Sequence, residues 1–202
     1  MVTIEQVINE LLKLDEISNI YTWAEETFPD ELECTEGVYR FCIISKTWDK
    51  VIKMDQIGAC GCCANEAEMY EIGKQYGIEE LLLKPTFVDE LASGQQIYLQ
   101  EKATYIQDTL PVSKVMQYGT EIEKITHEEI RRLVDKLFHS RIHHQWLAKL
   151  LIIYDKEFVK RFIKWQVETR QNDLHAANIG YRFDKPVILD YANNTSFDFE
   201  SY

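Results

Sequence analysis

The stretch QNDLHAANIGYRFDKPVILDY, residues 171–191, holds three oxygen-bearing side chains around two short apolar runs. Within it, the apolar-rich runs NIGYRF and VILD are joined by DKP, a combination typical of a turn, so we expect a β-hairpin. Neighbouring antiparallel strands lie about 5 Å apart, and the open end of this hairpin should therefore place Asn178 beside Asp190. Asp173, in a loop before Asn178, is expected to reach the same pocket.

These three side chains indicate a metal site with a neighbouring base. One amide oxygen and one carboxylate are hard ligands that leave room for waters and phosphate oxygens, and they suit magnesium better than zinc. Asp173 would serve as the base. The alternative interpretation is a polar hairpin end whose side chains only cap nearby backbone groups.

Residues 31–54 carry a second set of strand signals. The runs ELECT and VYRFCIIS flank Glu36 and Gly37, a tight-turn signal, and KTWD separates the second run from KVIKM. This pattern predicts a three-stranded antiparallel meander. Residues 64–77 have helical spacing and end at a glycine, and a further strand is expected in QQIYLQEKA, residues 95–103.

From about residue 104 the chain changes character. Two segments with helical period follow, and Thr126 and Asp155 are candidate N-caps for them. The predicted order is strands with one helix, then helices, then a hairpin. This order is typical of an α+β protein. We therefore expect two lobes, residues 1–102 and residues 103–202.

Composition and charge limit which partners and which location we expect for the protein. The chain has 202 residues, of which 46% are hydrophobic, and its formal net charge is -12. That charge disfavours nonspecific binding to nucleic acid or to an anionic membrane. The N-terminal run reads as an amphipathic helix with Thr3 as its N-cap rather than as a signal peptide. The longest apolar stretch is too short to span a bilayer, so we expect a cytoplasmic protein.

The cysteines are clustered and odd in number, which does not suggest a disulfide framework. CGCC can supply soft ligands to zinc, but no second Cys pair or His pair with ligand spacing accompanies it. We interpret it as a reduced, Cys-rich turn before a helix. The five residues are Cys34, Cys42, Cys60, Cys62 and Cys63.

The motif NDLHAANIG…VILDY resembles the catalytic and metal-binding loops of the protein-kinase-like superfamily. Its DLHxxN form is especially similar to the aminoglycoside and choline phosphotransferases and to atypical bacterial kinases. The resemblance implies that ATP and Mg²⁺ are the cofactors, that Asp173 accepts or orients the hydroxyl proton of the substrate, and that Asn178 and Asp190 hold magnesium. His175 either packs under the loop or approaches the γ-phosphate.

The same resemblance predicts upstream residues. KVIKM places Lys53 on the third strand, similar to the V-A-I-K motif, and the next helix offers Glu66 as its partner, with Glu68 as the fallback. The alternative interpretation is a solvated strand lysine and a hydrated helix face. IYLQEKA resembles the hinge, where the backbone from Glu101 to Ala103 would hydrogen-bond adenine.

The sequence departs from the family pattern in several places. The glycine-rich phosphate loop is reduced to Gly37, and Gln171 and Asn172 replace the His-Arg of H-R-D. D-F-G becomes Asp190-Tyr191-Ala192, and ten residues follow, so the resemblance implies a truncated, mainly helical second lobe without activation-loop control.

The expected fold is α+β, a two-lobed protein-kinase-like fold with a small antiparallel sheet in the first lobe. The expected function is a minimal, atypical protein kinase that phosphorylates a Ser, Thr or Tyr hydroxyl, because the region that usually builds a small-molecule pocket is missing after the metal-binding Asp. Two alternatives stay open. One is a kinase for a small alcohol, sugar or antibiotic, and the other is a pseudokinase acting as a nucleotide-gated binding module.

Overall fold

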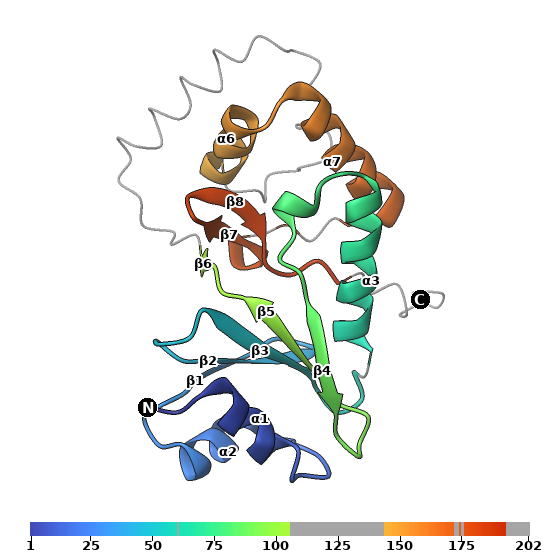
Figure 1. Cartoon of the computed structure of the whole chain (residues 1–202). Helices are drawn as coiled ribbons and strands as arrows, with labels where there is room; N and C mark the ends of the chain where they lie inside the picture. Colours follow the sequence, from blue (N-terminus) through green and yellow to red (C-terminus); the bar gives the residue numbers. More distant parts are fainter. Residues whose placement is uncertain (60, 106–143, 172–173, 175, 193–202) are drawn as a thin grey trace. The chain divides into compact units, whose positions relative to one another are not determined.

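The computed structural model describes residues 1–59, 61–105, 144–171, 174 and 176–192. Helices and two antiparallel sheets are segregated along the chain, which confirms the α+β class (Figure 1). No helix among the described residues is both long and apolar enough to cross a bilayer.

The chain divides into two compact units. The first comprises Met1–Glu68, Lys84–Lys102 and Ala192, and the second comprises Met69–Leu83 and Ala103–Tyr191. The second unit therefore includes Met69–Leu83, which precedes the boundary expected at residue 103.

The first unit is built on a five-stranded antiparallel sheet with the order β1-β2-β3-β5-β4. The predicted meander and the strand after it are confirmed. An additional strand, β4, was not expected, because most of its residues are exposed and its register shifts between Phe87 and Asp89, so the usual alternation is missing. The strands are β1 (Glu33–Glu36), β2 (Arg40–Ile44), β3 (Lys50–Asp55), β4 (Thr86–Glu90) and β5 (Gln96–Glu101).

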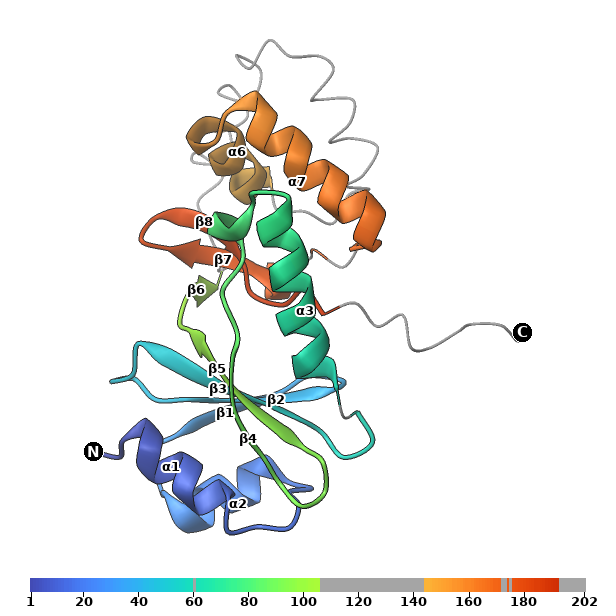
Figure 2. The same ribbon diagram turned by 45° about the vertical axis from the view of Figure 1, so that its right-hand side comes forward.

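One face of this sheet is apolar and is covered by two helices, α1 (Ile4–Leu11) and α2 (Ile20–Thr27), which Figure 2 shows on the same side of the sheet. Thr3 caps α1 as predicted and forms a capping box with Gln6. The helix α2, capped by Asn19, was not expected. The buried side chains of this core include Val7, Leu11, Ile20, Phe41, Ile43, Ile52, Met54 and Ile97.

The helix α3 (Cys62–Gln75) follows β3 and corresponds to the helix predicted over residues 64–77. It begins at a tertiary cap, because the carboxylate of Asp55 accepts hydrogen bonds from the backbone N–H groups of Gly61 and Cys63, each at 2.8 Å. It ends two residues before Gly77, whose φ of 66° suits a glycine at a helix terminus.

The second unit contains two helices and a small sheet. The helices are α6 (His144–Ile153) and α7 (Lys156–Thr169), the strands are β6 (Thr104–Tyr105), β7 (Ile179–Arg182) and β8 (Lys185–Ile188), and two 3₁₀ turns are η1 (Glu79–Leu81) and η2 (Ala176–Asn178). Asp155 caps α7 as predicted, whereas Thr126 lies outside the described residues. The buried indole N–H of Trp146 is shared between the carbonyls of Gly180 and Val187, which fixes α6 on the hairpin.

The hairpin of β7 and β8 is confirmed, but its turn was predicted at the wrong residues. The turn residues are Phe183 and Asp184, both with positive φ, and Pro186 pairs with Tyr181 inside β8. Two residues of positive φ match the right-handed twist of the flanking strands. Pro186 is tolerated because β8 is an edge strand, so its missing N–H costs no ladder hydrogen bond.

Gly180 allows β6 to pair with β7, and its replacement should destabilise the second unit. A Cβ atom at Gly180 would lie 2.4 Å from the carbonyl oxygen of Thr104. We expect Gly180→Ala to lower the free energy of unfolding by about 1–3 kcal/mol, measured by thermal denaturation. Gly37→Ala is the control, since a Cβ there would meet no atom closer than 3.7 Å. Equal melting temperatures for Gly180→Ala and wild type would contradict this account of the β6–β7 contact.

Candidate functional site

The face of the first sheet that is turned away from α1 and α2 carries polar side chains. Side chains alternate along a strand, so Lys53 and Asp55 of β3 share one face while Ile52 and Met54 point to the apolar core. Cross-strand pairing puts Arg40 opposite Asp55 on that same face. Gln100 of β5 pairs with Val51, which places it there as well. We call Arg40, Lys53, Asp55 and Gln100 the polar face; all four side chains are buried.

A single carboxylate, that of Glu66 in α3, gathers three of these side chains. The ammonium of Lys53 donates to both carboxylate oxygens, at 2.9 Å and 3.0 Å. The guanidinium of Arg40 donates to Oε2 at 2.5 Å, and the amide of Gln100 donates to Oε1 at 3.4 Å. Glu66 is fully buried, with 0% of its surface exposed. Three strands therefore contribute one donor each to the same buried anion.

The position of Glu66 on the helix explains why it, and not Glu68, meets Lys53. Successive residues of an α-helix are rotated by about 100°, so two residues further on the side chain points away. Glu68 is exposed. Lys53, for its part, is not a solvated strand lysine, since only 6% of its surface is accessible.

Asp55 and Arg40 were not among the residues singled out from the sequence. The sequences of β2 and β3 did not indicate that Arg40 and Asp55 are buried. In a strand of alternating apolar and polar residues, a buried charged residue cannot be told from an exposed one. Asp55 acts on the start of α3 through its two backbone contacts. Burial, and after it the nearby carboxylate of Asp55, raises the pKa of the Cys63 thiol well above its ordinary value. Cys34, Cys42, Cys62 and Cys63 are free cysteines.

Gly37 lies in the exposed turn between β1 and β2. Its backbone N–H donates to the carbonyl of Arg40 at 2.9 Å, and its own carbonyl accepts from the amide of Gln56 at 2.7 Å. The φ of Gly37 is not in the left-handed region. The turn is therefore closed by internal hydrogen bonds.

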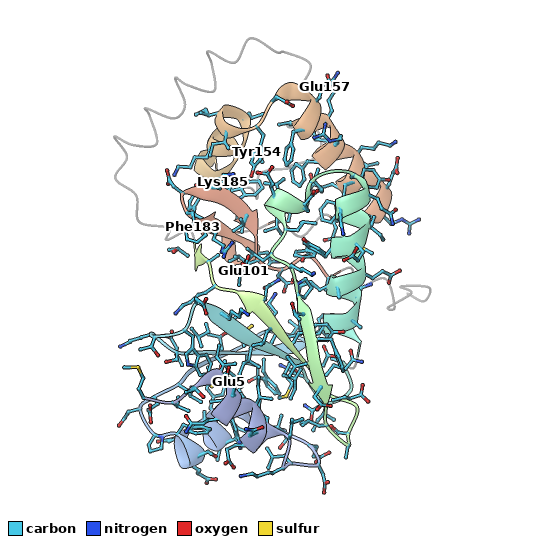
Figure 3. The ribbon with its side chains drawn as sticks, in the orientation of Figure 1. Glu5, Glu101, Tyr154, Glu157, Phe183 and Lys185 are labelled. Carbon is cyan, nitrogen blue, oxygen red and sulfur yellow. The ribbon has the colours of Figure 1, made fainter. Side chains whose placement is uncertain are left out.

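The predicted hinge, Glu101 to Ala103, begins at the last residue of β5 and ends at the first residue of a segment of the second unit. Glu101, labelled in Figure 3, is the last residue of β5 and pairs with Lys50. The next residue, Lys102, donates its backbone N–H to the carbonyl of Asp49 at 2.8 Å. Ala103 is half-buried and precedes β6.

In the second unit, the open end of the hairpin brings the backbones of Asn178 and Asp190 together. The carbonyl of Asn178 accepts the N–H groups of Leu189 at 2.8 Å and of Asp190 at 3.4 Å. Both residues are half-buried. An amide and a carboxylate at one hairpin end are oxygen donors of the kind that magnesium takes, with waters or phosphates completing its shell.

Gln171 organises the chain on either side of this hairpin end. It is buried, its side-chain amide donates to the carbonyl of Tyr191, and its own carbonyl accepts from Gln166. The hydroxyl of Tyr191 donates to the carbonyl of Leu83 at 2.6 Å. The segment that leads toward Asp173 is thereby tied to the one that follows Asp190. Asp173 and His175 themselves lie outside the described residues.

Comparison of the chain with protein-family models, with curated proteins and with solved structures found no match. The contacts of Lys53, Glu66, Asn178 and Asp190 are the observations from which we infer a function.

Removing the charge of Glu66 should destabilise the first unit strongly. Glu66→Gln removes the carboxylate that two buried cations share, and breaking a buried ion pair in this way costs about 3–5 kcal/mol. We expect a loss of this size in urea denaturation followed by circular dichroism. The matched control is Glu68→Gln, the same change at the exposed position two residues on, with an expected effect within about 0.5 kcal/mol. Similar losses for the two variants would show that the buried carboxylate is not a main support of the fold.

Proposed function

We propose that the chain is an ATP- and magnesium-dependent phosphotransferase with a two-lobed protein-kinase-like fold, and that it transfers the γ-phosphoryl group to a hydroxyl. The observation that supports the proposal most is the buried ion pair between Lys53 and Glu66. A lysine on the third strand of an antiparallel sheet, paired with a glutamate on the next helix, is the arrangement that protein kinases use at the nucleotide phosphates.

In this proposal Lys53 binds the α- and β-phosphates and Glu66 orients it. A lysine side chain has several rotatable bonds, so a carboxylate that accepts at both oxygens restricts where its ammonium lies. Low solvent exposure strengthens the attraction between that ammonium and a phosphate. Gly37 and the backbone of Glu101 to Ala103 are the proposed contacts for phosphate and adenine.

Magnesium is proposed to bind Asn178 and Asp190. When bound, the ion neutralises charge on the phosphates and holds their geometry, which is most of what phosphoryl transfer requires. The adjacent backbones of the two residues support this assignment, because both side chains start from the same hairpin end. Asp173 is the proposed base that accepts or orients the proton of the attacking hydroxyl, and His175 is a proposed second contact near the γ-phosphate.

The proposed acceptor is a Ser, Thr or Tyr hydroxyl of a protein, by resemblance to compact protein kinases. A small alcohol, sugar or antibiotic is the alternative acceptor, since DLHAAN is similar to the motif of small-molecule phosphotransferases. A pseudokinase that binds nucleotide without transfer is a further candidate. The N–H of Gly37 favours it, because that donor is already used within the turn.

The activity can be tested with γ-labelled ATP and magnesium. Wild type is incubated alone, with a cell lysate and with a panel of small hydroxyl compounds, next to Asp173→Ala and Asp190→Ala. We expect label in a protein band with wild type and a loss of at least about a hundred-fold in both variants, because each removes a group that the transfer step requires.

The other results are equally informative. Label in a small molecule would assign the alternative acceptor. If neither wild type nor the variants transferred label, while ATP still raised the melting temperature, the pseudokinase would be supported. If ATP changed neither labelling nor melting temperature, the proposed function would be wrong.

A further inference from the structure

The polar face and Glu66 of α3 together hold four buried charged side chains, and their balance bears on how an anion can bind there. Arg40 and Lys53 are cationic, and Asp55 and Glu66 are anionic, so the set is neutral overall. These are also the only charged residues that are buried among the described residues. In a medium of low polarity, each of these buried charges interacts strongly with its neighbours.

Arg40 lies closer to Glu66 than Lys53 does. Its guanidinium is 2.5 Å from Oε2 of Glu66, and the ammonium of Lys53 is 3.0 Å from that same oxygen. Arg40 comes from β2 and Lys53 from β3, so the two cations approach the carboxylate from neighbouring strands. A guanidinium stays protonated under all ordinary conditions, which makes Arg40 a permanent counter-ion.

Without Arg40 the set would be net negative. Two buried carboxylates would face one ammonium, and Lys53 would be fully neutralised by Glu66. A polyphosphate approaching Lys53 would then meet a net negative site. With Arg40 in place the four charges balance, so a phosphate that approaches Lys53 does not meet a net negative site.

We propose that Arg40 is a positioning residue which neutralises Glu66, so that the charge of Lys53 can be shared with the phosphates of a nucleotide. The inference rests on the proposed function, because it assumes that Lys53 binds those phosphates. It adds a residue of β2 to the nucleotide site and names the electrostatic condition under which the Lys53–Glu66 pair can bind an anion. Arg40 touches Glu66 and is not assigned a contact with the nucleotide.

The test compares charge with hydrogen bonding at position 40. Arg40→Gln retains a donor for Glu66 but has no charge, whereas Arg40→Lys retains the charge. The matched control is Gln100→Met, which removes a neutral donor from the same carboxylate on the same face. The dissociation constant of Mg·ADP is measured by calorimetry for each variant and for wild type, after thermal denaturation without nucleotide has confirmed that each is folded.

We expect Arg40→Gln to weaken Mg·ADP binding about ten-fold or more, as expected for the loss of one nearby unit charge in a partly dehydrated site. Arg40→Lys should restore most of the affinity, and Gln100→Met should lose less than Arg40→Gln. Raising the ionic strength should narrow the gap between wild type and Arg40→Gln. A purely structural Arg40 would lower the melting temperature and leave the affinity of the folded protein unchanged.

Each outcome has one meaning. If wild type binds Mg·ADP and Arg40→Gln binds it equally well, the role of Arg40 is refuted while the proposed function stands. The same holds if Arg40→Lys binds as weakly as Arg40→Gln, because charge would then not be what matters. If wild type does not bind Mg·ADP, the proposed function fails and the inference falls with it. Should Arg40→Gln not fold, Arg40→Met replaces it in the same comparison.

Discussion

The fully buried carboxylate of Glu66 links α3 to three strands of the first sheet. Moving a charge out of water costs several kcal/mol, and the cost is met only when the charge is paired and its oxygens accept hydrogen bonds. The sheet meets that requirement with one side chain from each of three strands, and α3 is attached to the sheet through it. Register, strand order and the start of α3 must all be correct for these contacts to form.

The two faces of the sheet consequently differ in chemical character. The face that packs on α1 and α2 is apolar and supplies the hydrophobic stabilisation, which is proportional to the area removed from water. The polar face contributes little hydrophobic stabilisation. Charges and amides buried there are expensive unless they serve a purpose, and perturbed or buried ionisable groups concentrate at functional sites. The second unit has its own core, and its hairpin end sets Asn178 beside Asp190 for a separate reason, the antiparallel pairing of β7 and β8.

Much of this arrangement follows from local patterns. Alternation and turn signals predict the meander, helical spacing predicts α3, and two apolar runs predict the hairpin, because each depends on near neighbours. Lys53 and Glu66 were found through motif order, and the choice between Glu66 and Glu68 needed the orientation of the helix. The burial of Arg40, Asp55 and Gln171 was not predicted, since it depends on partners that lie elsewhere along the chain. The turn at Phe183 was also missed, because a bulky residue is an uncommon choice at positive φ.

The central claim is that the ammonium of Lys53 binds the phosphates of ATP. It can be tested with an adenosine that carries a sulfonyl fluoride in place of the phosphates, which reacts with a lysine amine to give a sulfonamide and releases fluoride. We predict that mass spectrometry will find this label on Lys53, in preference to exposed lysines such as Lys74, and that excess Mg·ATP will suppress it. Labelling that spares Lys53, or that excess Mg·ATP does not reduce, would contradict the account.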